Sequence, residues 1–321
     1  MKLAVLQPNK LGQSKVTTLI IDEERVEQRL DNFLFNKFKN IPKSRIYKML
    51  RSGEVRVNKK RAKPSYKLQL DDIIRIPPFW VEMSVENKPG HNLVKLLLST
   101  IVFEDSKILV INKPASIASH GGSGINFGAI EILRAARSDL KNLELVHRLD
   151  RDTSGCLILA KKRSALRELH KLTNDGKILK KYMLLVKGNW QNGQRIVDMP
   201  LLKSVVKSGE RIVTVNNGGK ESITIFRPLK VGKDVSLLEA ELKTGRTHQI
   251  RAHASFIGYP IAGDKKYGDA EFNSMMKKLG LRRLFLHAKK ISFCWRTGEE
   301  VNFLTKLSDS LQNILSQIFV V

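Results

Sequence analysis

Residues Glu144–Lys162 read ELVHRLDRDTSGCLILAKK. This stretch places one acid, Asp150, between Arg148 and Arg151, and it continues into an unbroken apolar run, Cys156–Ala160. An apolar run of this length is typical of a fully buried strand. Neighbouring cations keep a carboxylate ionised even in a partly dry environment. The stretch therefore predicts a charged acid at the entry to a buried strand, and Asp150 is the first candidate for chemistry.

The whole chain is strongly basic. Its 321 residues include 57 Lys and Arg against 31 Asp and Glu, which gives a net charge of +26. Hydrophobic residues make up 42% of the chain, so the excess charge belongs to a protein with a core to bury. Such a charge predicts a polyanionic partner. Nucleic acid is the first candidate for this partner, and an anionic membrane surface is the second. The alternative interpretation is a solvated basic surface that has no partner.

The sequence also bears on the protein's location. The apolar stretches are shorter than the ~20 residues of a membrane-spanning helix, and residues 1–15 read as an N-terminal tail without a secretory hydrophobic region. The two cysteines, Cys156 and Cys294, are far apart in the sequence and predict neither a disulfide framework nor a thiolate metal site. We therefore expect a soluble cytoplasmic protein that does not associate with membranes.

Residues 16–78 form a short, basic module in which two amphipathic helices are predicted. The first lies within ERVEQRLDNFLFNKF, where the apolar positions with helical spacing are Val26, Leu30, Phe33 and Leu34. The second lies within IPKSRIYKMLRSG, with Ser44 as its N-cap and Gly53 at its end. Its predicted buried stripe consists of Ile46, Met49 and Leu50.

The remainder of this module, EVRVNKKRAKPSYKLQLDDIIRIP, alternates as paired strands do, with a turn at Asn58-Lys59-Lys60. From about Arg25 to Pro77 the order of these elements resembles the S4 RNA-binding domain. The resemblance implies that basic side chains of the module contact RNA phosphates, and the matching positions are Arg45, Lys48, Arg51, Lys59, Lys60 and Arg61. A merely solvated basic helix face is the alternative interpretation.

A second domain is predicted after a linker. Residues 79–100 contain Pro89 and Gly90 among mixed polar residues, which favours a linker. From 101 to 321, apolar runs typical of strands alternate with helical patterns, which indicates a mixed α+β domain. The predicted strands are Ile108–Asn112, Cys156–Ala160, Tyr182–Val186, Val235–Leu242 and Lys290–Cys294, and the predicted helices include Asn126–Ala136 and Arg163–Leu172.

Ordinary catalytic motifs do not account for the surroundings of Asp150. The glycine-rich segment SHGGSGINFG lacks the lysine of a phosphate-binding loop. His248 and His253 are five residues apart, which does not place both on one helical face, so we expect structural roles and no metal site. Neither Ser154 nor Cys156 has a recognisable base. An aspartate that acts as nucleophile or base remains.

Five segments between about Ile108 and Phe293 are similar, in order, to motifs of the RluA/RluC family of RNA pseudouridine synthases. They read ILVINKPASIASHGG, VHRLDRDTSG, KKYMLLVKG, TGRTHQIRAHASFIGYPIAGDKKYG and RLFLHAKKISF. The resemblance implies a catalytic domain with a mixed, largely antiparallel central sheet and flanking helices. The sequence departs from the family pattern at Ser116, where glycine is usual, and in SFCWRTGE.

The resemblance also implies roles for four residues. Asp150 matches the catalytic aspartate, Tyr182 a tyrosine that stacks on the uracil, and Arg251 a basic residue that pairs with the aspartate. Arg148 matches an arginine that enters the RNA stack as the target uridine leaves it, a role that suits a planar guanidinium. Asp150 is expected to attack C1′, to remove a proton from C2′, or to attack the ring, and the sequence does not choose among these routes.

The implied activity is the isomerisation of uridines to pseudouridine in large-subunit (23S) ribosomal RNA by a monomer. No cofactor is expected, because the same two fragments are separated and rejoined without net redox or hydrolysis. A non-enzymatic S4-type RNA-binding or ribosome-assembly factor is the alternative function. A hydrolase of nucleosides or glycosides would normally require two carboxylates that flank the bond, and Asp152 is the only acid near Asp150 in sequence.

Overall fold

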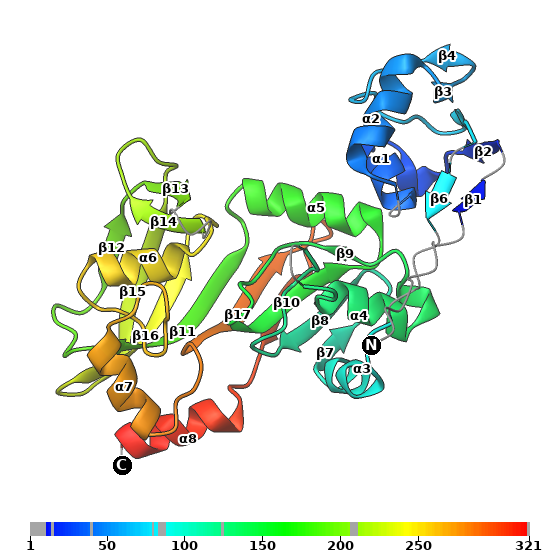
Figure 1. The fold of residues 1–321 in the computed structure, drawn as a ribbon. Coiled ribbons are helices and arrows are strands. Elements are labelled where there is room, and N and C mark those ends of the chain that lie inside the picture. The colour runs from blue at the N-terminus through cyan, green and yellow to red at the C-terminus, as the bar shows by residue number, and fades with distance from the viewer. Residues whose placement is uncertain are drawn as a thin grey trace, which may run out of the picture. The chain divides into compact units, whose positions relative to one another are not determined.

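The computed structural model describes residues 11–13, 16–38, 41–78, 80–82, 88–122, 125–205 and 211–319. The chain divides into two compact units, Met1–Lys88 and Pro89–Val321. Each unit has a hydrophobic core of its own, and most elements of both are labelled in Figure 1.

The first unit contains two helices beside a small antiparallel sheet. Its helices are α1 (Leu30–Lys37) and α2 (Lys43–Ser52), preceded by the 3-10 turn η1 (Glu23–Arg25). The sheet has the order β2-β5-β3-β4, with β2 Thr17–Ile20, β5 Ile73–Ile76, β3 Arg56–Val57 and β4 Lys60–Arg61. Two further short strands, β1 (Leu11–Gln13) and β6 (Trp80–Glu82), pair with each other.

The local predictions for this unit are correct in part. Ile46, Met49 and Leu50 are buried, and Gly53 ends α2 in the left-handed conformation with φ 73°, as predicted. The assignment of Ser44 as N-cap is wrong. The helix begins at Lys43, and the carbonyl of Pro42 accepts its first hydrogen bonds, from the N–H groups of Arg45 and Ile46. Ser44 therefore lies inside the first turn, where its hydroxyl cannot cap the helix.

The first helix is also shorter than predicted, because Val26 lies outside it. Arg29 is extended and forms a β-bridge with Lys67, and the N–H of Leu30 donates to Tyr66. The strand-like pairing before Leu30 excludes helical hydrogen bonds there. The predicted turn at Asn58-Lys59-Lys60 comprises Asn58 and Lys59, both with positive φ, while Lys60 begins β4.

The segment 79–100, predicted as a linker, contains β6 and the helix α3 (His91–Leu98). Leu97 is fully buried in the core of the second unit, so this helix belongs to that unit. The Pro89-Gly90 pair, which suggested a linker, instead precedes the helix, with Gly90 at the N-cap. Of the predicted tail 1–15, residues 1–10, 14 and 15 lie outside the described residues.

In the second unit, ten strands form one sheet among the described residues, with the main order β12-β15-β16-β11-β17-β10-β8-β7. The β10–β17 pair is parallel and the other pairs are antiparallel, which confirms the predicted mixed, largely antiparallel sheet. The strands are β7 Ile101–Glu104, β8 Ile108–Lys113, β9 Glu144–Leu145, β10 Ser154–Ala160, β11 Leu179–Lys187, β12 Arg195–Asp198, β15 Ile223–Val231, β16 Val235–Leu242, β17 Leu286–Cys294 and β18 Glu300–Leu304.

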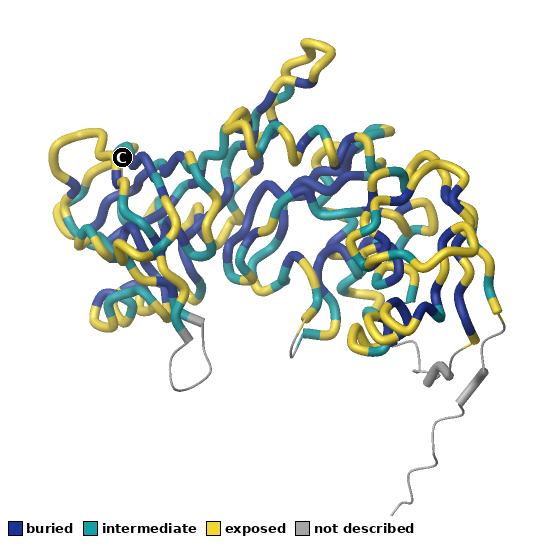
Figure 2. Tube along the Cα trace, turned by 90° about the horizontal axis from the view of Figure 1, so that it is seen from above, coloured by how far each residue is buried: buried dark blue, intermediate teal, exposed yellow. Residues whose placement is uncertain are grey.

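Helices and a separate hairpin complete this unit. The helices after α3 are α4 Ala129–Ala136, α5 Arg163–Asn174, α6 Gln249–Phe256, α7 Ala270–Lys278 and α8 Asp309–Ile318, with a 3-10 turn, η2, at Ser138–Leu140. The hairpin is formed by β13 (Leu201–Val205) and β14 (Arg211–Val215). Figure 2 shows buried residues concentrated in the sheet and exposed residues at the turns.

The alternation along β11 assigns its two faces to two cores. Tyr182, Leu184 and Val186 belong to the larger cluster of this unit. Leu185 belongs to a second cluster, which α7 and α8 cover with Phe272, Met276 and Leu311 among others. Because successive side chains of a strand point to opposite faces, Tyr182 lies on the same face as Leu184 and away from α7 and α8.

Candidate active site

Asp150 lies in the loop between β9 and β10, and neighbouring groups hold this loop in place. The hydroxyl of Ser119 donates to the carbonyl of Leu149 and accepts from its N–H, both at 2.9 Å. Gly155, at the start of β10, has φ 113°, and a Cβ there would lie 2.3 Å from the carbonyl oxygen of Ala288 on β17. Only glycine allows the chain to pass so close to β17 directly after the loop.

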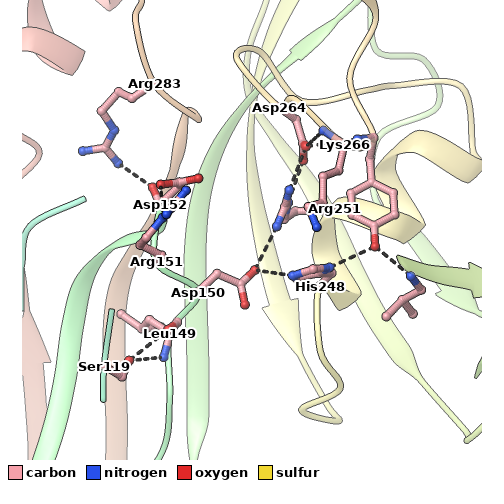
Figure 3. A network of polar contacts seen from close by, with 12 residues as sticks. Ser119, Leu149, Asp150, Arg151, Asp152, His248, Arg251, Asp264, Lys266 and Arg283 are labelled. Carbon is pink, nitrogen blue, oxygen red and sulfur yellow. Dashed lines mark hydrogen bonds and ion pairs between the residues drawn. The ribbon is translucent and has the colours of Figure 1, made fainter. Parts of the chain in front are cut away.

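Arg251 of α6 reaches Asp150 across 101 residues of sequence. Its Nη1 donates to Asp150 Oδ2 at 3.2 Å, while its Nε and Nη2 donate to the two carboxylate oxygens of Asp264 at 2.7 and 2.8 Å (Figure 3). Burial by itself lowers the pKa of Arg251, but Asp264 and Asp150 outweigh it, and the pKa is raised. The guanidinium is therefore a permanent cation beside Asp150.

Asp264 is a residue of this network that was not expected from the sequence. It is buried and also accepts from the N–H groups of Lys266 and Tyr267. Although burial raises the pKa of this carboxyl, the hydrogen bonds and charge of Arg251 outweigh burial and lower it. A bidentate partner fixes the plane of a guanidinium, so Asp264 sets the direction in which Arg251 presents its remaining donor.

His248 is a second residue that the sequence reading missed, since it was assigned a structural role. Its Nε2 lies 3.8 Å from Asp150 Oδ2, and its Nδ1 lies 2.9 Å from the hydroxyl of Tyr267. Burial lowers the pKa of His248 more strongly than the charge of Asp150 raises it. The residue precedes α6 with φ 53°, a strained conformation for a side chain of this size.

The hydrogen bonds of Tyr267 indicate which nitrogen of His248 carries the proton. The Tyr267 hydroxyl accepts from the N–H of Val213 on β14, so its own proton is available to His248 Nδ1. The neutral imidazole then carries its hydrogen on Nε2, which faces Asp150. Helical spacing gives no signal for His248 in the sequence, because the residue precedes α6 in the left-handed conformation.

Tyr182 and Arg148 line the same cavity as Asp150, Arg251 and His248, and the cavity has a volume of about 1360 Å³. Tyr182 is largely buried, and burial, followed by the charge of Asp150, raises its pKa. Arg148 is exposed, and its Nη1 lies 3.0 Å from His120 Nε2. The structure therefore brings all four residues of the implied catalytic set to one cavity, and their roles stay predictions.

The remaining histidines near the motifs have structural contacts. His253 is fully buried between Thr224 Oγ1 and the carbonyl of Met199, both at 2.9 Å. His147 accepts from the N–H of Ile158. Within the described residues, no three His, Cys, Asp or Glu side chains are grouped as metal ligands would be.

The basic residues assigned to RNA binding lie in the first unit. Arg45 pairs with Glu54 at 3.0 Å. The other five candidates, Lys48, Arg51, Lys59, Lys60 and Arg61, are exposed. Arg61 lies over Gly53, where any Cβ would meet its side chain at 2.5 Å.

Ser116, the departure in the first motif, adopts φ 71°, the left-handed region in which the usual glycine has no steric cost.

No described helix has both the length and the apolar character needed to cross a bilayer.

Comparison with known proteins agrees with both halves of the chain. The family model described as RNA pseudouridylate synthase matches residues 107–256, and the S4 domain model matches residues 28–74. The chain is 48% identical to ribosomal large subunit pseudouridine synthase C of Haemophilus influenzae, over 97% of this chain and 98% of that protein. It is 47% identical to the protein of the same name from Escherichia coli K12, over 96% and 98%.

A solved structure also matches much of the chain. Human RNA pseudouridylate synthase domain containing 4 superimposes with a TM-score of 0.59 at 26% identity, over 71% of this chain and 96% of that one.

Proposed function

We propose, from the premise that this chain belongs to the family of RNA pseudouridylate synthases, that it isomerises uridines of large-subunit (23S) ribosomal RNA to pseudouridine. The observation that carries the proposal is the position of Asp150 in a large cavity, with the cation of Arg251 3.2 Å from its carboxylate. Relatives with this activity in their name match the chain over nearly its full length. The high positive charge suits an RNA substrate.

Asp150 is the proposed catalytic group, and Arg251 is the group that maintains its charge. All three chemical routes, attack at C1′, proton removal from C2′ and attack on the ring, begin with an ionised carboxylate aimed at the nucleotide. Arg251 provides the opposite charge that favours this form. His248 directs a second N–H toward the same oxygen from 3.8 Å, which is longer than a hydrogen bond.

Tyr182 and Arg148 are proposed to handle the base and the RNA stack. The Tyr182 ring lies in the cavity wall and offers a flat surface for a uracil turned out of the RNA. Arg148 is exposed at the same cavity, and the guanidinium can stack in the space that the uridine leaves while it contacts phosphates. Such filling offsets the few kcal/mol of stacking that are lost when a base flips.

The proposal is tested by complementing a strain that lacks this activity and mapping pseudouridines in its 23S RNA. Asp150→Asn and Asp150→Ala should abolish the modification, because neither retains an ionised carboxylate. Asp152→Asn is the matched control, a half-buried acid two residues away, and it should retain the modification. Modification by either Asp150 variant would refute the assignment. Loss with Asp152→Asn would instead favour a mechanism with two carboxylates.

The first unit is proposed to add affinity and placement without taking part in the chemistry. Its exposed cations resemble those with which S4 domains contact RNA. Neutralising Lys48 and Arg51 together should weaken RNA binding and reduce the dependence of the binding constant on salt, since each phosphate contact releases counterions. Binding titrations at several salt concentrations measure this, and an unchanged salt dependence would exclude these contacts.

We further propose that the enzyme acts in the cytoplasm, as a monomer and without a cofactor.

A further inference from the structure

One wall of the cavity comes from a short stretch of chain, residues 173–180, which lies within a basic segment. The end of α5, the turn at Gly176 and the start of β11 contribute Thr173, Asn174, Gly176 and Lys180 to the lining. Residues 162–181, which include this wall, contain seven Lys and Arg against two Asp and Glu. A basic wall beside a site for a nucleotide is suited to the anionic part of that nucleotide, its phosphates.

Lys180 lies in this wall next to the residue proposed to hold the base. Lys180 and Tyr182 are two residues apart on β11, and both line the cavity. Alternate residues of a strand lie on one face, about 6.6–6.8 Å apart along the chain. A base stacked on Tyr182 therefore brings its own sugar–phosphate backbone close to the Lys180 ammonium.

Among the described residues, Lys180 differs from Arg251 and Arg148 of the same cavity in having no partner. Arg251 bonds to two carboxylates, and Arg148 contacts His120. Within the described residues, the ammonium of Lys180 has neither a hydrogen bond nor an ion pair, although the side chain is half-buried and burial lowers its pKa. An uncompensated cation in such a place costs stability, which a bound anion would recover.

The protein does not compensate this charge through His147. His147 lines the same cavity, and burial, followed by the charge of Lys180, lowers its pKa to about 3. His147 is therefore neutral at physiological pH. The one acid in the adjoining turn, Asp175, is exposed.

The cations continue outside the cavity. Ala165, Leu166 and Leu169 bury one side of α5, so the opposite side faces solvent. Lys171 of α5 and Lys177, which follows the helix, are both exposed, on either side of the turn that contributes Asn174 and Gly176 to the cavity. A strand of RNA that enters the cavity at this wall would meet these two lysines before or after Lys180.

We propose that Lys180 binds a phosphate adjoining the flipped uridine, and that Lys171 and Lys177 bind the neighbouring phosphates of the same strand. This inference rests on the proposed function, because it assigns a further substrate contact at that site. It makes the α5–β11 corner, residues 171–180, a further RNA-backbone contact of the catalytic unit, in addition to Arg148.

The test pairs a protein substitution with a change in the RNA. RNA hairpins are prepared that contain a uridine on which the enzyme acts. The phosphates on either side of this target uridine are either natural or replaced by uncharged methylphosphonates. Single-turnover rates at increasing enzyme concentration then separate the Kd from the maximal rate. The proteins are the wild type, Lys180→Met, Lys180→Arg and, as a control, Lys277→Met, an exposed lysine of α7 outside the cavity.

Lys180→Met should raise the Kd for the natural hairpin about ten- to hundred-fold, which is typical for a lost hydrogen bond to a charged group. The maximal rate should change little, and Lys180→Arg should retain most of the affinity. At one position, the methylphosphonate should raise the Kd of the wild type by a similar factor. It should raise the Kd of Lys180→Met much less, because the contact is already absent. Lys277→Met should behave as wild type.

Two results would overturn the inference. One is an unchanged Kd for a folded Lys180→Met. The other is that, at every methylphosphonate position, the increase in Kd caused by Lys180→Met multiplies the increase caused by the methylphosphonate. Lys180→Met should melt at or above the wild-type temperature, because it removes an uncompensated charge. If the wild type modifies no ribosomal RNA at all, the proposed function fails instead.

The outer lysines are tested by salt dependence. The double variant Lys171→Gln, Lys177→Gln should make the slope of the logarithm of the binding constant against the logarithm of the salt concentration less steep by about 1–2. The value depends on whether the RNA is single-stranded or paired there. The paired control Lys277→Gln, Lys278→Gln should leave the slope unchanged. An equal slope for the two double variants would remove Lys171 and Lys177 from the proposed contact.

Discussion

Asp264 holds the guanidinium of Arg251 with two hydrogen bonds, Nε–Oδ2 at 2.7 Å and Nη2–Oδ1 at 2.8 Å. Both side chains are buried. The same guanidinium reaches Asp150 with a single bond of 3.2 Å. The tighter contact is thus made to the residue that positions Arg251, and the looser contact to the residue proposed to carry out the chemistry.

Asp264→Asn should therefore reduce both stability and activity. Loss of one partner leaves the charge of Arg251 buried with less compensation, which typically costs about 3–5 kcal/mol. Urea denaturation measures the stability, and single-turnover kinetics on a ribosomal RNA fragment measure the activity. The control is Asp234→Asn, an exposed acid outside this network, which should change neither quantity noticeably. A stable, fully active Asp264→Asn would show that Arg251 needs no such anchor.

The two arginines of the site should respond differently to the structure of the substrate. Arg148→Lys keeps a charge but loses the planar surface, so it should slow reaction at a uridine in stable structure far more than at an unpaired one. Arg251→Ala should slow both RNAs by a similar factor, because it acts on Asp150 rather than on the stack. Single-turnover rates on two matched RNAs decide, and equal slowing by Arg148→Lys would exclude the proposed base-flipping role.

Tyr267→Phe should lower the maximal rate and leave RNA binding unchanged. The change keeps the ring, whose centre lies 5.1 Å from the Arg251 guanidinium, but removes the hydroxyl that contacts His248 and Val213. His248 then no longer has a fixed tautomer facing Asp150. We expect a loss of roughly tenfold in rate, comparable to one hydrogen bond. Tyr259→Phe, whose hydroxyl contacts Asn189 instead, is the control. A raised Kd with an unchanged maximal rate would contradict the positioning role.

Stability should fall as the pH decreases from 6.5 to 4, in part because of His287. Burial lowers the pKa of this residue to about 4, and its ring contacts Ser154 and Thr305. The unfolded chain takes up the proton first, so the neutral histidine stabilises the fold above pH 6.5, and this contribution is lost toward pH 4. The slope is up to about 1.4 kcal/mol per pH unit.

Urea denaturation between pH 4 and 7 checks this, with His287→Gln expected to show a shallower dependence on pH. The exposed His170 provides the control, since His170→Gln should retain the wild-type slope. Parallel curves for the wild type and His287→Gln would show that the titration lies elsewhere.

Much of the fold follows from short-range patterns in the sequence. The apolar run Cys156–Ala160 is part of the buried strand β10, and Val235–Leu242 coincides with β16. Such runs are recognisable because burial on both faces requires apolar residues at every position. The helix α3 was missed because the Pro89-Gly90 pair that opens it has the same composition as a linker, and only its packing through Leu97 assigns it to the second unit.

The sequence by itself determined that the protein is basic, that it carries an S4-like module before an α+β domain, and that Asp150, Arg148, Tyr182 and Arg251 match motif positions. Only the tertiary structure decided that His248, Asp264 and Tyr267 join Asp150 and Arg251 in one network, and that Lys180 has no partner among the described residues. Hydrogen bonds and ion pairs depend on distances of about 3 Å between groups far apart in sequence. Local periodicity reports which face of an element is buried, but it does not report which charged groups the fold brings within that distance.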